Sequence, residues 1–125
     1  MWTIIKYEKK KLPFLKNDFL TKLGKDFIFY NPKLKIERYY KNKLKKIEIN
    51  LLEDYIFCFH PKFQNLEKVK DGLKYCRGLK YFLGGNIESQ NEIKNFINKC
   101  KSLEDKNGFV SKTFFELCKG LGYKF

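Results

Sequence analysis

Few residues in this chain could perform acid–base or nucleophilic chemistry. The sequence contains one histidine, His60, at the end of an apolar stretch and directly before a proline. A serine or cysteine nucleophile would need this imidazole as its base, but a histidine in that place is more typical of the surface end of a strand. Glu53 and Asp54 are adjacent carboxylates, and adjacent residues of a strand point to opposite faces. We therefore expect no catalytic residues and predict that the protein is not an enzyme.

The cysteines and glycines show no spacing typical of a metal or phosphate site. No two cysteines form a C-x-x-C pair, and the dipeptide Gly84-Gly85 lacks the pattern of a phosphate-binding loop. A chain of 125 residues can build an apolar core and does not need a disulfide framework. We expect no metal and no cofactor. We predict that the cysteines are reduced and mostly buried, as in a cytoplasmic protein: Cys58, Cys76, Cys100 and Cys118.

The formal net charge of +13 is the strongest compositional signal. Such a charge is typical of proteins that bind nucleic acid or another polyanion. However, only Arg38 and Arg77 among the 27 basic residues are arginine, and alanine is absent, a bias that AT-rich coding would produce whatever the function. Charge alone therefore leaves nucleic-acid binding open. No apolar run approaches the ~18 residues of a membrane span, and the first residues do not resemble a signal peptide, so we expect no membrane contact.

The stretch Asn50–His60 reads N-L-L-E-D-Y-I-F-C-F-H and is unusually apolar. A strand with one buried face needs apolar side chains only at alternate positions. Here every residue from Tyr55 to Phe59 is apolar or aromatic. Either both faces of this strand are covered by the protein itself, or one face binds a partner.

Periodicity and turn residues predict strands and helices in an alternating order. Pro13 and Gly24 suit the first turn and the C-terminal cap of a helix, and Ser89 with Glu92 forms a capping box. The predicted strands are residues 2–7, 26–30, 34–40, 44–49, 54–60 and 79–83, and the predicted helices are residues 12–23, residues 66–74 and a helix that begins near residue 89.

This order of elements predicts an α+β fold, in which helices pack on a mainly antiparallel sheet in a sandwich related to ferredoxin-like folds. The length suits one domain, which we place at residues 1–105. Residues 34–49 form a strongly basic hairpin around a K-N-K turn. Residues 106–125 are expected to be a C-terminal tail or the start of a linker, with a short helix near residues 111–118 as one alternative.

Three short motifs occur together in this chain in a defined order. W-T-I-I-K-Y begins at Trp2, L-E-D-Y ends at Tyr55, and R-G-L-K-Y-F begins at Arg77, ahead of the helix opened by S-x-x-E. In this order they resemble the tryptophan-led strand, the F-P-G-Y or F-P-N-Y segment and the R-G-V-x-x-F segment of the N-terminal (NGN) domain of the NusG family. The resemblance covers about residues 1–105. It implies a non-catalytic transcription elongation and antitermination factor, which binds RNA polymerase near the non-template DNA and modulates pausing and processivity.

The resemblance also implies a polymerase-binding surface. By position, Leu52, Tyr55 and Phe57 would contact the clamp helices of the largest polymerase subunit, since residues 55 and 57 share one face of a strand. Ile56 and Cys58 would then face the core of the protein. The alternative is that Tyr55 and Phe57 are covered by the C-terminal tail or by a helix.

A basic side close to the non-template DNA is implied as well. Arg77 matches a position at which a specialised member of the family contacts DNA, and arginine offers a fork of donors that lysine lacks. Alternatively, Arg77 caps a helix end or a carbonyl group. The other candidates for phosphate contacts, which would be salt-sensitive, are Lys9, Lys10, Lys11 and Lys74.

The chain departs from the family in two respects. Glu53 and Asp54 stand where the family has P-G or P-N, so the partner could be a divergent, organellar or phage polymerase. The C-terminal KOW domain of the family has no counterpart in these residues, and no contact with Rho or the ribosome through that domain is implied. Two other functions stay open: a stand-alone RNA- or DNA-binding module whose sheet aromatics stack on bases, and a polymerase inhibitor that uses the same docking surface.

Overall fold

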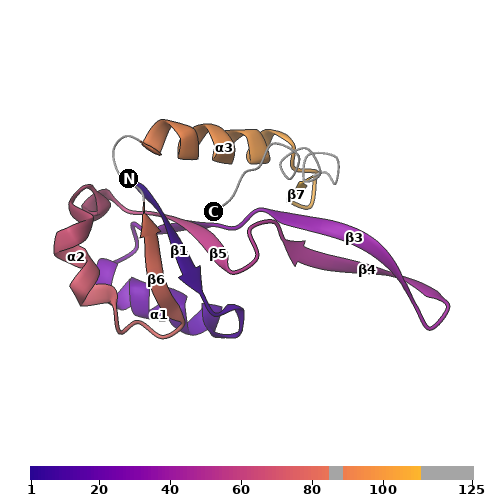
Figure 1. Cartoon of the computed structure of the whole chain (residues 1–125), viewed down its shortest axis with the longest axis horizontal. Helices are drawn as coiled ribbons and strands as arrows, with labels where there is room; N and C mark the ends of the chain where they lie inside the picture. The colour runs from indigo at the N-terminus through magenta and orange to yellow at the C-terminus, as the bar shows by residue number, and fades with distance from the viewer. Residues whose placement is uncertain (85–88, 111–125) are drawn as a thin grey trace. The chain divides into compact units, whose positions relative to one another are not determined.

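The computed structural model describes residues 1–84 and 89–110 and has helices and mainly antiparallel sheets (Figure 1), which confirms the predicted α+β class. The described residues form two compact units, each made of two stretches of chain. The first unit contains Met1–Tyr30 and Asp54–Lys94, and the second contains Asn31–Glu53 and the described residues from Asn95 onward. Helix α3 (Gln90–Ser102) contributes residues to both units.

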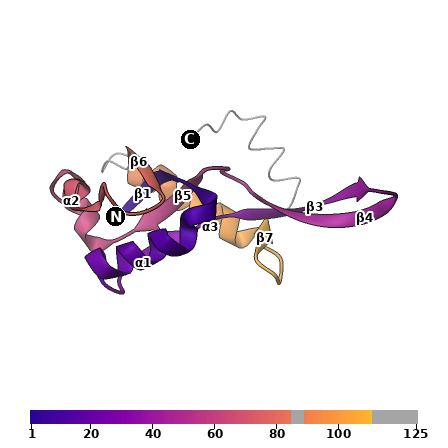
Figure 2. The same cartoon turned by 90° about the horizontal axis from the view of Figure 1, so that it is seen from below.

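The first unit is a four-stranded sheet with two α-helices. In chain order its elements are β1 (Trp2–Tyr7), the 3₁₀ helix η1 (Lys9–Lys11), α1 (Leu12–Leu23), β2 (Ile28–Tyr30), β5 (Tyr55–Phe59), the 3₁₀ helix η2 (Pro61–Asn65), α2 (Leu66–Leu73) and β6 (Leu79–Gly84). The strands lie in the order β2-β5-β1-β6, and each neighbouring pair is antiparallel. In the view of Figure 2, α1 runs below β1, β5 and β6.

The core of the first unit lies between one face of this sheet and the two helices. Ile5 of β1 and Ile56 of β5 are almost fully buried and belong to one apolar cluster with Leu15 and Phe19 of α1 and Leu73 of α2. Alternate strand residues reach the same face, so this cluster uses every second residue of β1 and β5.

Helix α1 has the bounds that the sequence predicts. Pro13 stands in its first turn, where a missing N–H leaves no hydrogen bond unmade. At the other end, Gly24 has a φ of 80°, and its N–H donates to the Leu20 carbonyl at 2.9 Å. These local signals start and stop the helix independently of its packing.

His60 is buried, which corrects the expectation of a surface histidine. Only 3% of the residue is exposed. The Lys62 main-chain N–H donates to His60 Nδ1 at 3.0 Å, so the proton of the neutral ring is on Nε2, which lies 3.1 Å from the Leu23 carbonyl. The imidazole therefore joins the end of α1 to the start of η2.

The second unit contains a three-stranded sheet in the order β4-β3-β7. Its strands are β3 (Lys33–Tyr40), β4 (Lys43–Asn50) and β7 (Phe109–Val110). β3 and β4 form the predicted hairpin, in register from Lys33↔Asn50 to Tyr40↔Lys43, with a turn of two residues rather than three. β7 pairs in parallel with the start of β3 and lies in the segment that we expected to be a tail. The helix considered near residues 111–118 lies outside the described residues.

The cysteines within the described residues form no disulfide in this structure, and their burial agrees with the prediction. Cys58 and Cys100 have no exposed surface, and Cys76 is 7% exposed. Burial raises the pKa of Cys58 and Cys76. Cys118 lies outside the described residues. Among residues 1–84 and 89–110, no helix is long and apolar enough to cross a lipid bilayer.

Candidate functional site

Two tyrosines and a lysine form a surface cluster on the first sheet, which we call the tyrosine patch: Lys6, Tyr55 and Tyr81. Lys6 on the central strand β1 is the register partner of Tyr55 on β5 and of Tyr81 on β6. The two hydroxyl groups are 3.2 Å apart and share a hydrogen bond. The Lys6 Nζ atom lies 5.6 Å from the centroid of the Tyr55 ring and 5.8 Å from that of the Tyr81 ring. The two rings therefore contact each other through their hydroxyl groups, and both make cation–π contacts with the lysine.

The tyrosine patch offers a mainly uncharged aromatic surface. Tyr81 is 45% exposed and Tyr55 is half-buried. The hydrogen bond to Tyr81 and, to a lesser extent, desolvation raise the pKa of Tyr55. Such a surface suits an apolar or aromatic partner that also supplies a hydrogen-bond acceptor.

Phe57 does not reach the surface, although it lies on the same strand face as Tyr55. Its exposed fraction is 0%. Trp2 packs edge-on against it with ring centroids 6.4 Å apart, and Tyr30 stacks on it at 6.5 Å. The structure therefore disagrees with an exposed Phe57 and agrees with the alternative that the protein covers this face itself.

Leu52 is also buried, with 8% of the residue exposed, and it belongs to the second unit. Ile56 and Cys58 face the core, as expected. The apolar stretch thus has both faces covered at residues 56–58. Of the three predicted polymerase contacts, only Tyr55 presents a side chain at the surface.

Lys6 and Tyr81 were not predicted from the sequence as site residues. Tyr81 follows Lys80 and precedes Phe82, a core-packed residue, so strand alternation places Tyr81 on the opposite face. That signal was present in the sequence. The pairing of β1 with both β5 and β6, which unites the three side chains, was not.

The predicted basic residues after β1 form the exposed turn η1. Lys9 lies 3.8 Å from an Asp54 carboxylate oxygen, and Lys11 lies 3.4 Å from a Glu8 carboxylate oxygen. Exposed pairs of this kind contribute little to stability, so the lysines remain available to a phosphate. Lys10 is exposed as well.

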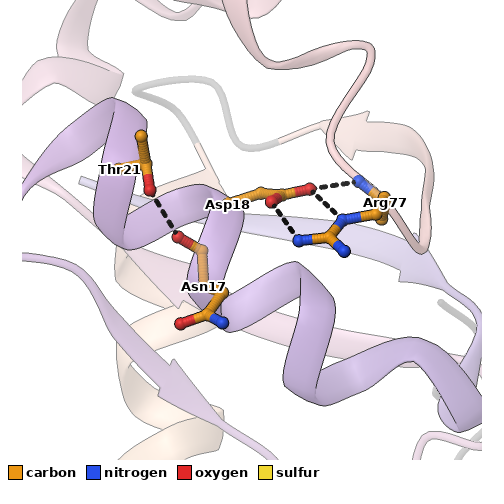
Figure 3. Close-up of polar contacts among 4 residues, drawn as sticks. All are labelled: Asn17, Asp18, Thr21 and Arg77. Carbon is orange, nitrogen blue, oxygen red and sulfur yellow. Dashed lines mark hydrogen bonds and ion pairs between the residues drawn. The ribbon is translucent and has the colours of Figure 1, made fainter.

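Arg77 uses its fork of donors within the protein (Figure 3). Its Nε and terminal nitrogen donate to the two Asp18 carboxylate oxygens at 3.1 and 2.9 Å, and its main-chain N–H donates to Asp18 at 2.7 Å. The guanidinium group also lies 4.6 Å from the centroid of the Phe14 ring. None of the alternatives from the sequence, which were DNA contact and capping of a helix end or a carbonyl group, included this carboxylate on α1.

The Asp18–Arg77 pair is strongly charge-assisted. Hydrogen bonds from Arg77 lower the pKa of Asp18 from 3.8 to about 2, and the same bonds raise the pKa of Arg77. The arginine is more than half exposed, so one edge of its guanidinium group still faces solvent. Lys74 is exposed and lies 5.1 Å from the centroid of the exposed Tyr75 ring.

Arg77 and the η1 lysines are brought together through the next residue, Gly78. The Glu8 N–H donates to the Gly78 carbonyl at 2.8 Å. A Cβ atom on Gly78 would be 2.9 Å from the Lys11 Cβ, so the two chain segments touch. The structure thus joins four of the five predicted nucleic-acid-binding residues in one region: Lys9, Lys10, Lys11 and Arg77.

Comparison with protein-family models and with curated proteins gives no match to this chain.

Proposed function

We propose that this chain is a non-catalytic transcription elongation or antitermination factor of the NusG type, which binds the clamp helices of RNA polymerase near the non-template DNA and modulates pausing and processivity. The order of elements supports the proposal: strand, helix, strand, basic hairpin, strand, helix, strand and helix follow one another as the resemblance implies. The three motifs that carry the resemblance lie on β1, at the start of β5 and on β6.

The observation that carries the proposal is the exposed tyrosine patch. It contains Tyr55, one of the three residues at which the resemblance expects a polymerase contact, and adds Tyr81 and Lys6 beside it. We therefore revise the contact surface. Lys6 and Tyr81 replace Leu52 and Phe57, which are buried.

The region of η1 and Arg77 contains the residues that are proposed to contact DNA. Lysines act as point charges toward phosphates and need no fixed geometry. Lys9, Lys10 and Lys11 can fill that role as they stand, whereas Arg77 would use only the edge of its guanidinium group that Asp18 leaves free. DNA binding by this region should accordingly be weak and salt-sensitive.

A pull-down against core RNA polymerase of the same organism, free of nucleic acid and at about 0.3 M salt, tests the proposal. Tyr55→Ala should weaken binding by about 2 kcal/mol or more, roughly 30-fold, because it removes a central aromatic anchor. Tyr55→Phe keeps the ring and should bind nearly as well as the wild type. Tyr75→Ala is the matched control, since Tyr75 is 85% exposed and lies outside the tyrosine patch. Equal retention of the wild type and Tyr55→Ala would refute the proposed docking surface.

A stand-alone nucleic-acid-binding module is the second candidate, favoured by two tyrosines beside a lysine at the surface of the first sheet. Sheet aromatics of this kind can stack on bases. This function requires binding to free oligonucleotide through Tyr55 and Tyr81, without polymerase. If polymerase binding is found instead, the sign of the effect on transcript elongation separates a factor from an inhibitor.

A further inference from the structure

The tip of the β3–β4 hairpin has a composition that folding does not require. We define the hairpin tip as residues 39–46, Y-Y-K-N-K-L-K-K, which contain four lysines and no acidic residue. Tyr39 is 81% exposed, Tyr40 is 55% exposed and Leu44 is 52% exposed. These side chains bury little apolar surface, so core packing does not account for them.

The turn itself keeps a lysine in an unfavourable conformation. Lys41 and Asn42 have φ values of 50° and 63°, the left-handed pair that a two-residue hairpin turn needs. Asparagine and glycine tolerate this region, whereas a lysine there is strained. The Lys41 Nζ lies 5.4 Å from the Tyr40 ring centroid, and the Lys45 Nζ lies 4.8 Å from it. The tip therefore gathers positive charge around an exposed ring despite the strain.

Charge is balanced near the base of the hairpin but not at its tip. The register pairs Lys35 with Glu48 near the base and Glu37 with Lys46 at the boundary of the tip, whereas Tyr40 within the tip is opposite Lys43. Within residues 1–84 and 89–110, β7 pairs with Lys33 and Leu34 at the base, and the tip is a ribbon of two strands (Figure 1). An isolated two-stranded ribbon is marginally stable, and clustered lysines destabilise it further. A bound polyanion would remove that repulsion.

We propose that the hairpin tip binds a single strand of nucleic acid, with lysines on the phosphates and Tyr39 stacked on a base. Lysines on the open strand β4 would also discourage pairing with another chain, but that role does not explain the exposed tyrosines. Stacking on an exposed ring together with point charges for the backbone is the usual means of binding single strands without sequence preference. The tip shares no residue with the tyrosine patch or with η1, and binding by the tip does not require polymerase.

Fluorescence anisotropy with the full chain and a labelled oligothymidylate of about 15 nucleotides tests this site. Tyr39→Ala should weaken binding about tenfold, within the range expected for one stacked base. Lys43→Gln with Lys45→Gln should reduce the slope of log affinity against log salt by about 1.4, because each phosphate contact on a single strand contributes about 0.7. The matched control is Lys16→Gln with Lys68→Gln, which removes the same charge from exposed positions on α1 and α2. It should leave the slope within about 0.3 of the wild type.

Three results would overturn the inference. Equal effects of the two lysine pairs would mean that binding follows net charge and not the hairpin tip. Unchanged affinity in Tyr39→Ala would remove the base-stacking contact on which the choice of a single strand depends. If the tip lysines contributed to binding of vesicles with anionic lipid but not to binding of the oligonucleotide, the tip would be assigned to a membrane surface. The assay contains no polymerase, so its result is independent of the Tyr55 experiment.

Discussion

Gly78→Ala should strongly destabilise the first unit, for two reasons that can be measured separately. Gly78 has a φ of 84°, and an alanine in the left-handed region costs about 1–2 kcal/mol. The new Cβ would lie 2.9 Å from the Lys11 Cβ and 3.2 Å from the Lys11 carbonyl oxygen. Overpacking of this kind typically costs about 1–3 kcal/mol. We expect the free energy of unfolding to fall by roughly 2–5 kcal/mol in total.

A double-mutant cycle with Lys11→Gly isolates the steric part. This change removes the nearer of the two contacting atoms, and glycine is acceptable at Lys11 because that residue is the N-cap of α1. Gly78→Ala should therefore cost about 1 kcal/mol less in the Lys11→Gly background than in the wild type. Urea denaturation followed by circular dichroism gives all four free energies. Additive effects of the two changes, or a Gly78→Ala variant within about 0.5 kcal/mol of the wild type, would show that the close approach does not constrain this turn.

Two further predictions concern titration and thiol reactivity. An NMR titration should place the pKa of Asp18 at about 2. Because this folded value lies below the ordinary 3.8, the Asp18–Arg77 pair stabilises the fold fully above about pH 5 and loses its contribution as pH falls toward 2. A measured pKa near 3.8 would contradict the bidentate geometry. Iodoacetamide should leave Cys58 and Cys100 unmodified in the native protein and alkylate both in denaturant, as read by peptide mass mapping, whereas native labelling of Cys58 would contradict its burial.

Elements with local signals could be predicted from the sequence. Pro13 and Gly24 delimit α1 by chain geometry alone. Alternation of side chains predicted the strands of the hairpin and the strands that flank it in the sequence, which belong to the first sheet. β7 was missed because a strand of two residues has no period to detect, and its partner β3 lies far earlier in the chain.

The candidate site was harder to predict because its side chains meet partners that are distant in sequence. Alternation correctly places Tyr55 and Phe57 on one strand face, but it does not reveal that Trp2 and Tyr30 cover Phe57. Arg77 is separated from its Asp18 partner by 59 positions. Local sequence thus predicts which face a side chain occupies, and only tertiary contacts decide whether that face is open.

The connection between β2 and β5 bears on how such a chain could diversify. These strands are antiparallel neighbours, with Tyr30 opposite Phe57, and the intervening residues 31–53 contribute strands to a different sheet. The hairpin is therefore an insertion in the link between two adjacent strands. Insertions of this kind tolerate changes of length and sequence, because the register of the host sheet does not depend on them. Related chains could exchange or rebuild this hairpin, and with it the ligand that it binds, while the host sheet and its core packing remain the same.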